Sequence, residues 1–102
     1  MEKKTRITQE KLEKYYSLSK EALKIIKASI IKGKESQAKE VLEMVECYLK
    51  DSKHFEEKND WVNAFACINY AHGWIDCACR LKIFKVNDPK LFADDENKEK
   101  IN

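Results

Sequence analysis

Apolar residues recur every three or four positions along two long stretches of the chain, 8–31 and 35–58. This spacing places them on one side of a helix and leaves the other side polar, so each stretch predicts an amphipathic helix. The first apolar seam consists of Leu12, Tyr15, Ser19, Ala22, Leu23, Ile26 and Ile30, and the second of Ala38, Val41, Leu42, Val45, Tyr48, Leu49, Ser52 and Phe55. Thr8 is the expected N-cap of the first helix and Gly33 its expected end.

A third stretch, 61–84, follows the break at Asn59-Asp60 and is apolar on almost every side, which is normal for a buried helix. Asp60 is its expected N-cap. Its apolar positions are Trp61, Phe65, Ile68, Tyr70, Ala71, Trp74, Ile75, Cys77, Ala78 and Leu81, and a narrow polar stripe holds Asn69, His72, Gly73, Asp76 and Arg80. Glycine destabilises a helix interior, so we expect Gly73 where a neighbouring group comes too close for a Cβ atom.

Three helices of similar length with short breaks between them predict an all-α, up-down-up three-helix bundle over residues 1–84. The remaining residues, 85–102, predict a polar tail with one docked helical turn at 89–93. The chain has 102 residues, of which 43% are hydrophobic, and only 2 Gly and 1 Pro, which argues for one helical domain and against a disordered chain or a sheet protein.

A lone bundle leaves part of the third helix uncovered, because two neighbouring helices cover little more than half of its circumference. Single-chain proteins seldom expose a large contiguous apolar patch. We therefore expect a homodimer or a complex with a protein partner, through a surface that includes Trp61, Trp74, Leu18 and Ile25. The alternative is that the tail covers this surface.

The polar stripe has two interpretations. In antiparallel helices, residues at equal distances from the break between them lie at the same height in the bundle. This rule places Tyr16, Asp51, Asn69 and His72 in one layer, with Asp76 and Arg80 further along the third helix. These six residues could form a small-ligand site, in which Asp76 orients His72 and Arg80 holds an anion. The interpretation that we favour is a buried polar network in which the groups satisfy one another.

Charge and cysteine content narrow the possible functions. Twenty basic and 18 acidic residues give a net charge of +2, and Arg6 and Arg80 are the only arginines, so nucleic-acid binding is not favoured. No stretch resembles a signal peptide or a membrane span, so we expect a cytoplasmic protein. Four cysteines lack metal-ligand spacing and are expected as free, packing thiols, and no cofactor, metal or catalytic arrangement is indicated.

The segments Tyr48–Phe55, Asn59–Ala66 and Tyr70–Asp76, followed by Arg80-Leu81, resemble an archaeal family catalogued as domain of unknown function 357. The resemblance implies a small three-helix bundle and no established activity. Members are sometimes joined to nucleotidyltransferase-like domains, which implies an accessory role. Lys82 stands where the family usually has Gly, so the third helix is expected to run longer here. The leading hypothesis is a non-enzymatic interaction or accessory module, and the alternative is a small-ligand or nucleotide-binding domain.

Overall fold

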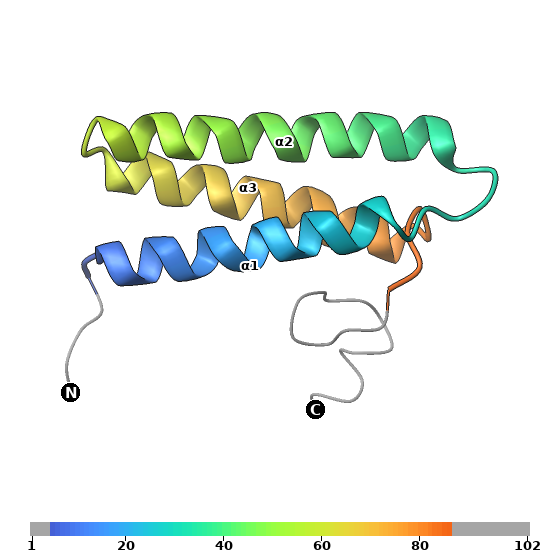
Figure 1. The fold of residues 1–102 in the computed structure, drawn as a ribbon, viewed down its shortest axis with the longest axis horizontal. Coiled ribbons are helices and arrows are strands. Elements are labelled where there is room, and N and C mark those ends of the chain that lie inside the picture. The colour runs from blue at the N-terminus through green and yellow to red at the C-terminus, as the bar shows by residue number, and fades with distance from the viewer. Residues whose placement is uncertain (1–4, 87–102) are drawn as a thin grey trace, which may run out of the picture.

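Three long helices, each antiparallel to the next in sequence, form the part of the chain that the computed structural model describes, residues 5–86. The helices are α1 (Gln9–Lys27), α2 (Glu35–Glu57) and α3 (Trp61–Arg80). α2 and α3 lie side by side along most of their length, and α1 packs against both of them (Figure 1). The predicted all-α, up-down-up three-helix bundle is therefore confirmed.

The two predicted N-caps are present. The Thr8 hydroxyl accepts a hydrogen bond of 3.1 Å from the backbone N–H of Lys11, and the Asp60 carboxylate accepts one of 3.2 Å from that of Asn63. Each side chain satisfies one of the N–H groups that have no partner inside the helix. α1 and α3 therefore begin where the sequence predicts.

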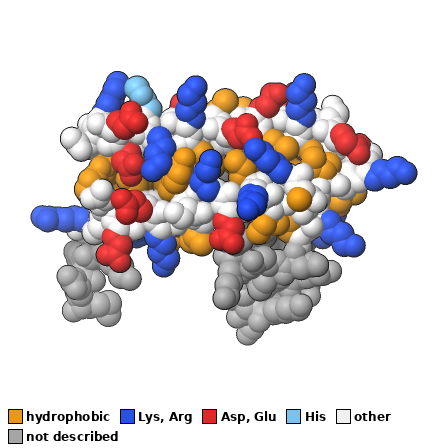
Figure 2. Space-filling view, viewed as in Figure 1, with side chains coloured by type: hydrophobic (Ala, Val, Ile, Leu, Met, Phe, Trp, Pro, Cys, Tyr) orange, Lys and Arg blue, Asp and Glu red, His pale blue; other side chains and the backbone are white. Residues whose placement is uncertain are grey.

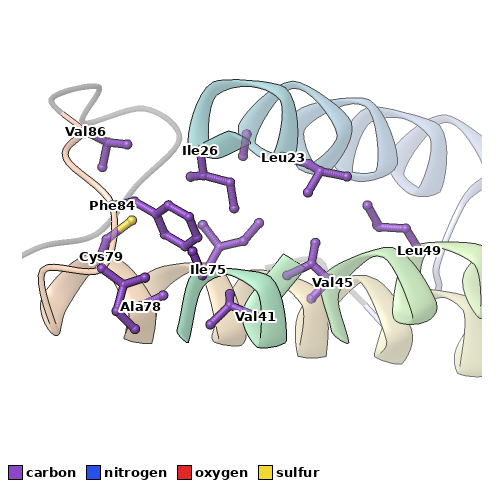
Figure 3. Packing of buried hydrophobic residues seen from close by; sticks show 14 residues of the cluster. Leu23, Ile26, Val41, Val45, Leu49, Ile75, Ala78, Cys79, Phe84 and Val86 are labelled. Carbon is purple, nitrogen blue, oxygen red and sulfur yellow. The ribbon is translucent and has the colours of Figure 1, made fainter. Parts of the chain in front are cut away.

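Most of the predicted seam positions of α1 and α2 line the core, but Ile30 does not, because it lies beyond the end of α1 and is 37% exposed. The buried residues of these helices are Leu12, Ser19, Ala22, Leu23 and Ile26, with Ala38, Val41, Val45, Leu49 and Ser52. Residues beyond α3 complete the core: Phe84 is only 1% exposed and lies between Ile26 of α1 and Ile75 of α3 (Figure 3). A second, smaller cluster contains Leu12, Ala64 and Ile68.

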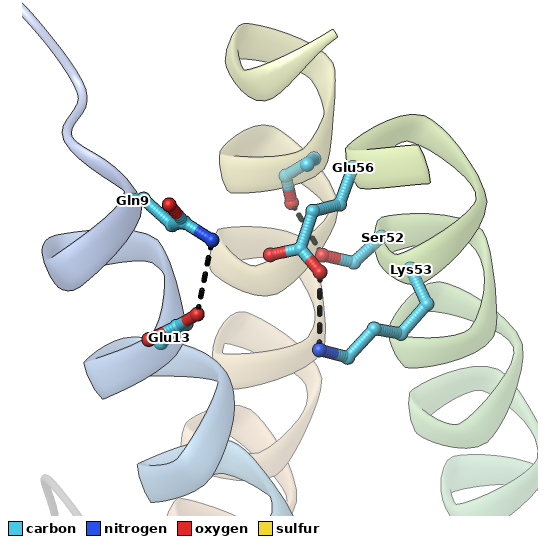
Figure 4. Close-up of polar contacts among 6 residues, drawn as sticks. Gln9, Glu13, Ser52, Lys53 and Glu56 are labelled. Atoms are coloured by element: carbon cyan, nitrogen blue, oxygen red, sulfur yellow. Dashed lines mark hydrogen bonds and ion pairs between the residues drawn. The ribbon is translucent and has the colours of Figure 1, made fainter. Parts of the chain in front are cut away.

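Two serines lie in this apolar interior with their hydroxyl groups satisfied. Ser52 of α2 donates a hydrogen bond of 2.8 Å to the carbonyl of Ala64 in α3 (Figure 4). Ser19 donates one of 3.0 Å to the carbonyl of Tyr15 in its own helix. A buried hydroxyl without a partner would destabilise the fold, so these bonds explain how serines occupy seam positions. The bond from Ser52 also ties α2 to α3 directly.

The ends of α1 and α3 differ from the prediction. α1 ends at Lys27 rather than near residue 31, with Ala28 as its C-cap, and Gly33 adopts a φ of 93° further along the connection to α2. The backbone from Ser29 to Ile31 is instead extended beside the segment that follows α3. Ile31 donates to the carbonyl of Ile83 at 3.0 Å, and Lys85 donates to that of Ser29 at 2.8 Å.

This pairing also shortens α3, which ends at Arg80 rather than at residue 84. Lys82 has a φ of 61°, in the left-handed region that glycine adopts without strain, so the expectation that it prolongs the helix is wrong. The chain then turns back and buries Ile83, Phe84 and Val86, which extends the core to residue 86. The expected helical turn at 89–93 lies outside the described residues.

Candidate functional site

One side of α3 is free of charge over most of its length, because no Asp, Glu, Lys or Arg occurs from Trp61 to Ile75 in a chain that is 37% charged. The side that faces the core carries Ala64, Cys67, Ile68, Ala71, Ile75, Ala78 and Cys79. The opposite side, which we call the outer face of α3, carries Val62, Asn69, Tyr70, Gly73, Trp74, Cys77 and Leu81 at the C-cap, all exposed. Its large apolar side chains are Val62, Tyr70, Leu81 and Trp74, which are 70%, 62%, 64% and 39% exposed.

A shallow hollow of about 350 Å³ lies in the middle of the outer face. It is lined by Asn69, Tyr70, Gly73, Trp74 and Cys77, whose helical spacing makes them surface neighbours. Tyr48 of α2 stacks on Tyr70, with ring centroids 5.4 Å apart and planes inclined by 22°. The stacking holds the ring of Tyr70, which forms one wall of the hollow. Gly73 has no side chain, so none fills the hollow at that position.

Gly73 is not a close-packed position within residues 5–86. A Cβ atom added at this position would meet nothing within 4 Å, so the expectation that a neighbouring group of the same chain excludes a side chain here is wrong. Glycine in a helix interior costs about 1 kcal/mol relative to alanine. This cost has no compensation inside the described part of the chain.

His72 and Asp76 lie half-buried on the flank of α3, one helical turn apart, and Arg80 is exposed at the last residue of the helix. Burial lowers the pKa of the His72 imidazole below its usual 6.5, and the Asp76 carboxylate opposes part of this effect. The structure therefore brings His72 and Asp76 together, as the sequence predicts.

The other predicted site residues lie on different sides of the molecule. Tyr16 lies in the groove between α1 and α2, where Lys53 Nζ is 4.1 Å from the centre of its ring. Asn69 lines the hollow on the outer face of α3. Asp51 is exposed on α2. Burial of the Cys67 thiol raises the pKa of that thiol, and the negative charge of the Asp51 carboxylate raises it further. Tyr16 and Asn69 thus line two different depressions rather than one site.

The groove between α1 and α2 has a volume of about 290 Å³ and a basic rim. Its lining consists of Tyr16, Lys20, Leu23, Glu46, Leu49, Lys50 and Lys53. Glu46 is paired across the groove with Lys27 of α1 at 2.6 Å. Charged side chains of both signs cover this side of the molecule, with apolar surface visible between them (Figure 2). The groove combines an apolar floor with ammonium groups, which sequence reasoning missed apart from Tyr16.

The predicted interface residues have different environments. Trp74 is exposed on the outer face, but Trp61 packs against the smaller core cluster, and Leu18 and Ile25 pack against the main core. Val62, Tyr70 and Leu81 were not predicted. A signal for them exists in the sequence, because residues 62, 66, 70, 73, 77 and 81 recur at helical spacing opposite the buried positions.

The four cysteines fall into two pairs. Cys67 and Cys79 are buried thiols, as predicted, whereas Cys47 and Cys77 are exposed, so a packing role is wrong for them. Within residues 5–86, no three His, Cys, Asp or Glu side chains come together as a group that could hold a metal ion. None of the described helices has the length and apolar character needed to cross a bilayer.

Comparison with known proteins identifies a family. The model of the family described as "Protein of unknown function (DUF357)" matches residues 14–84, which include nearly all of α1 and the whole of α2 and α3. No curated protein and no solved structure matches the chain.

Proposed function

Because the chain belongs to the DUF357 family, whose description assigns no activity, we propose from its geometry that it is a helical protein-interaction module that docks through the outer face of α3. We place it in the cytoplasm, where exposed thiols such as Cys47 and Cys77 stay reduced. The observation that carries the proposal is the row of exposed Val62, Tyr70, Trp74 and Leu81 on a helix without charge from Trp61 to Ile75.

The composition of this face favours a protein as its occupant. The centres of protein interfaces are depleted of charged residues and enriched in tyrosine and tryptophan. Tyr70 and Trp74 lie together at the hollow, and Tyr48 holds the tyrosine ring. Rigid aromatic groups of this kind lose little conformational freedom on binding and are frequent hot spots.

The apolar side chains of the outer face can offset only part of the cost of docking. Full burial of a Val, Leu or aromatic side chain is worth roughly 1.5–3 kcal/mol. Four such side chains lie on the outer face and are still 39–70% exposed, so their further burial is worth roughly 3.5–7 kcal/mol in all. The loss of translational and rotational freedom on association costs about 4–15 kcal/mol. Docking therefore requires the whole face rather than one residue.

Site-specific photo-crosslinking tests the proposal. A benzophenone amino acid replaces Val62, Trp74 or Leu81 in the chain within its native cells, and the controls replace Ser17 of α1 or Lys39 of α2, both exposed on other sides. We expect covalent adducts with protein, whether a second copy or a different chain, from the three α3 positions and not from the controls. Irradiated cells that contain only the unlinked chain for all three α3 variants would contradict the proposal.

The groove between α1 and α2 favours a second candidate function, binding of a small anionic ligand. Lys20, Lys50 and Lys53 line its rim beside Tyr16. Ammonium groups attract phosphate as point charges, and those of Lys20 and Lys50 add their effects, whereas Lys53 is already paired with Glu56 at 3.2 Å. This candidate moves the expected anion site from Arg80 to the lysines of the groove.

Thermal unfolding with and without pyrophosphate tests this candidate. Bound anion raises the melting temperature by mass action. We expect a concentration-dependent rise for the unaltered chain, its loss in the double variant Lys20→Gln/Lys50→Gln, and its retention in Lys39→Gln, a lysine outside the groove. An equal rise in all three chains would mean that the anion acts on general surface charge and would reject the site.

A further inference from the structure

We infer that the occupant of the outer face of α3 is a second copy of the same chain, whose α3 packs antiparallel to the first with the two helices crossing at Gly73. This inference rests on the proposed docking function and specifies its partner. Three observations support it: the outer face has no charged residue from Trp61 to Ile75, no other element of residues 5–86 packs closely on Gly73, and the two charged residues of α3 lie near its C-terminal end.

The absence of charge makes the face complementary to itself. A partner chosen by electrostatics presents the opposite charge, whereas the outer face offers no charged group from Trp61 to Ile75. Two copies also repel each other little, because each carries a net charge of only +2. An apolar, uncharged surface can be buried against an identical surface, as in the two-fold interfaces of homodimers, where both copies use the same patch.

Gly73 marks where the helices approach most closely. It lines the hollow, and no other element of residues 5–86 comes within 4 Å of a Cβ placed there. A glycine at this point lets the backbone of another helix come close, while Trp74 and Tyr70 beside it supply projecting side chains. The face thus contains both the depression and the projections that a two-fold contact pairs with each other.

The size of the face suits a small dimer interface. α3 has 20 residues, and a helix of that length is about 30 Å long and about 10–12 Å across. With the flank supplied by Tyr48 of α2 added, two such strips cover roughly 600–720 Å² before the relief of the side chains is counted, which is the size of a small, transient interface. We therefore expect a weak dimer that dissociates on dilution through the micromolar range.

Charge placement selects the antiparallel arrangement. The charged residues of α3, Asp76 and Arg80, both lie toward its C-terminal end. Parallel helices would set each of them level with the same residue of the second copy, and like charges across an interface are unfavourable. Antiparallel helices that cross at Gly73 set Arg80 level with Ala66 of the second copy. They also place the positive end of each helix dipole beside the negative end of the other, which is favourable.

Light scattering tests the second copy. At about 100 µM, above a micromolar Kd, we expect the unaltered chain at twice its 12.0 kDa mass. Gly73→Leu should have a Kd raised at least about ten-fold, and therefore a lower average mass than the unaltered chain over a dilution series, with unchanged helical circular dichroism, because a Cβ atom at this exposed position meets no other element of residues 5–86 within 4 Å. Ser17→Leu, which adds the same side chain to an exposed position of α1, should remain dimeric.

Disulfide trapping tests whether the α3 helices of the two copies are antiparallel or parallel. Cys47→Ser leaves Cys77 as the exposed thiol of residues 5–86, and Asn69→Cys adds a second thiol on the other side of Gly73. In the antiparallel dimer the two Cys77 residues are about 12 Å apart along the helix, too far for a disulfide. Residues 69 and 77 of different copies lie level instead. We therefore expect a linked dimer after oxidation only when Asn69→Cys is present.

Three results would overturn the inference. If Cys77 alone links two chains, the helices are parallel. If Gly73→Leu stays dimeric like Ser17→Leu, the copies associate elsewhere. If the unaltered chain has the single-chain mass at about 100 µM, no second copy occupies the face. In that last case, photo-adducts from Trp74 with a different protein would still support the docking function, whereas the absence of any adduct contradicts both.

Discussion

His72 is a titratable group that α3 holds in a half-buried position, so it couples folding to pH. Burial lowers the pKa of its imidazole, which means that the folded chain resists protonation while the unfolded chain accepts a proton near pH 6.5. The nearby Asp76 carboxylate weakens this resistance without reversing it. Stability associated with His72 is therefore present above pH 6.5 and is lost as the pH falls below it.

Urea unfolding at about pH 7.5 and about pH 5.5 checks this prediction. We expect the unaltered chain to lose free energy of unfolding at the lower pH, and His72→Gln to lose less of it. His54→Gln, which replaces the exposed histidine of α2, is the control and should lose as much as the unaltered chain because His72 is still present. An equal loss in all three chains would show that other groups cause the pH dependence.

Lys82 offers a second test at the scale of one residue. Its φ of 61° is unfavourable for a residue with a Cβ atom and costs glycine nothing. Lys82→Gly should raise the free energy of unfolding by about 0.5–1 kcal/mol, after allowance for the greater freedom of glycine in the unfolded chain. Lys85→Gly, at an exposed lysine without positive φ, should lower it, and a gain of similar size there would contradict this explanation.

At the scale of the elements, the sequence predicted the helices better than their ends. The seams of α1 and α2 follow from periodicity, and the caps Thr8 and Asp60 from their side chains. The ends of α1 and α3 depend on the pairing of Ser29–Ile31 with Ile83–Lys85, residues more than fifty positions apart. Local pattern contains no information about such a pairing, so the prediction extended both helices too far.

The segment after α3 acts as part of the core, and its loss should be costly. Phe84 is almost fully buried between α1 and α3, and truncation of a buried phenylalanine leaves a cavity (Figure 3). We expect Phe84→Ala to lower the free energy of unfolding by about 3–5 kcal/mol in a denaturant titration. Lys85→Ala, at the exposed neighbour, should change it by less than about 0.5 kcal/mol. A loss below about 1 kcal/mol for Phe84→Ala would mean that this segment does not hold α1 against α3.

At the scale of the whole molecule, the candidate site was predicted only in part. Matching of levels gives the height of a residue in the bundle but not the side toward which it points. Tyr16 and Asn69 were therefore expected in one layer, yet Tyr16 lies in the groove between α1 and α2 and Asn69 on the outer face of α3. The excess of apolar residues on α3 was readable from the sequence, whereas the side that the bundle leaves uncovered follows from how α1 and α2 pack.

Alkylation of Cys77 measures the occupation of this face most directly, because its thiol is exposed in a single chain and lines the hollow. Cys47, exposed on α2 away from the hollow, is an internal control in the same molecule. If two copies dock through α3, the rate at which iodoacetamide labels Cys77 falls relative to that of Cys47 as the protein concentration rises through the micromolar range. A ratio of the two rates that stays constant from the lowest to the highest concentration would contradict the docking of two copies through α3.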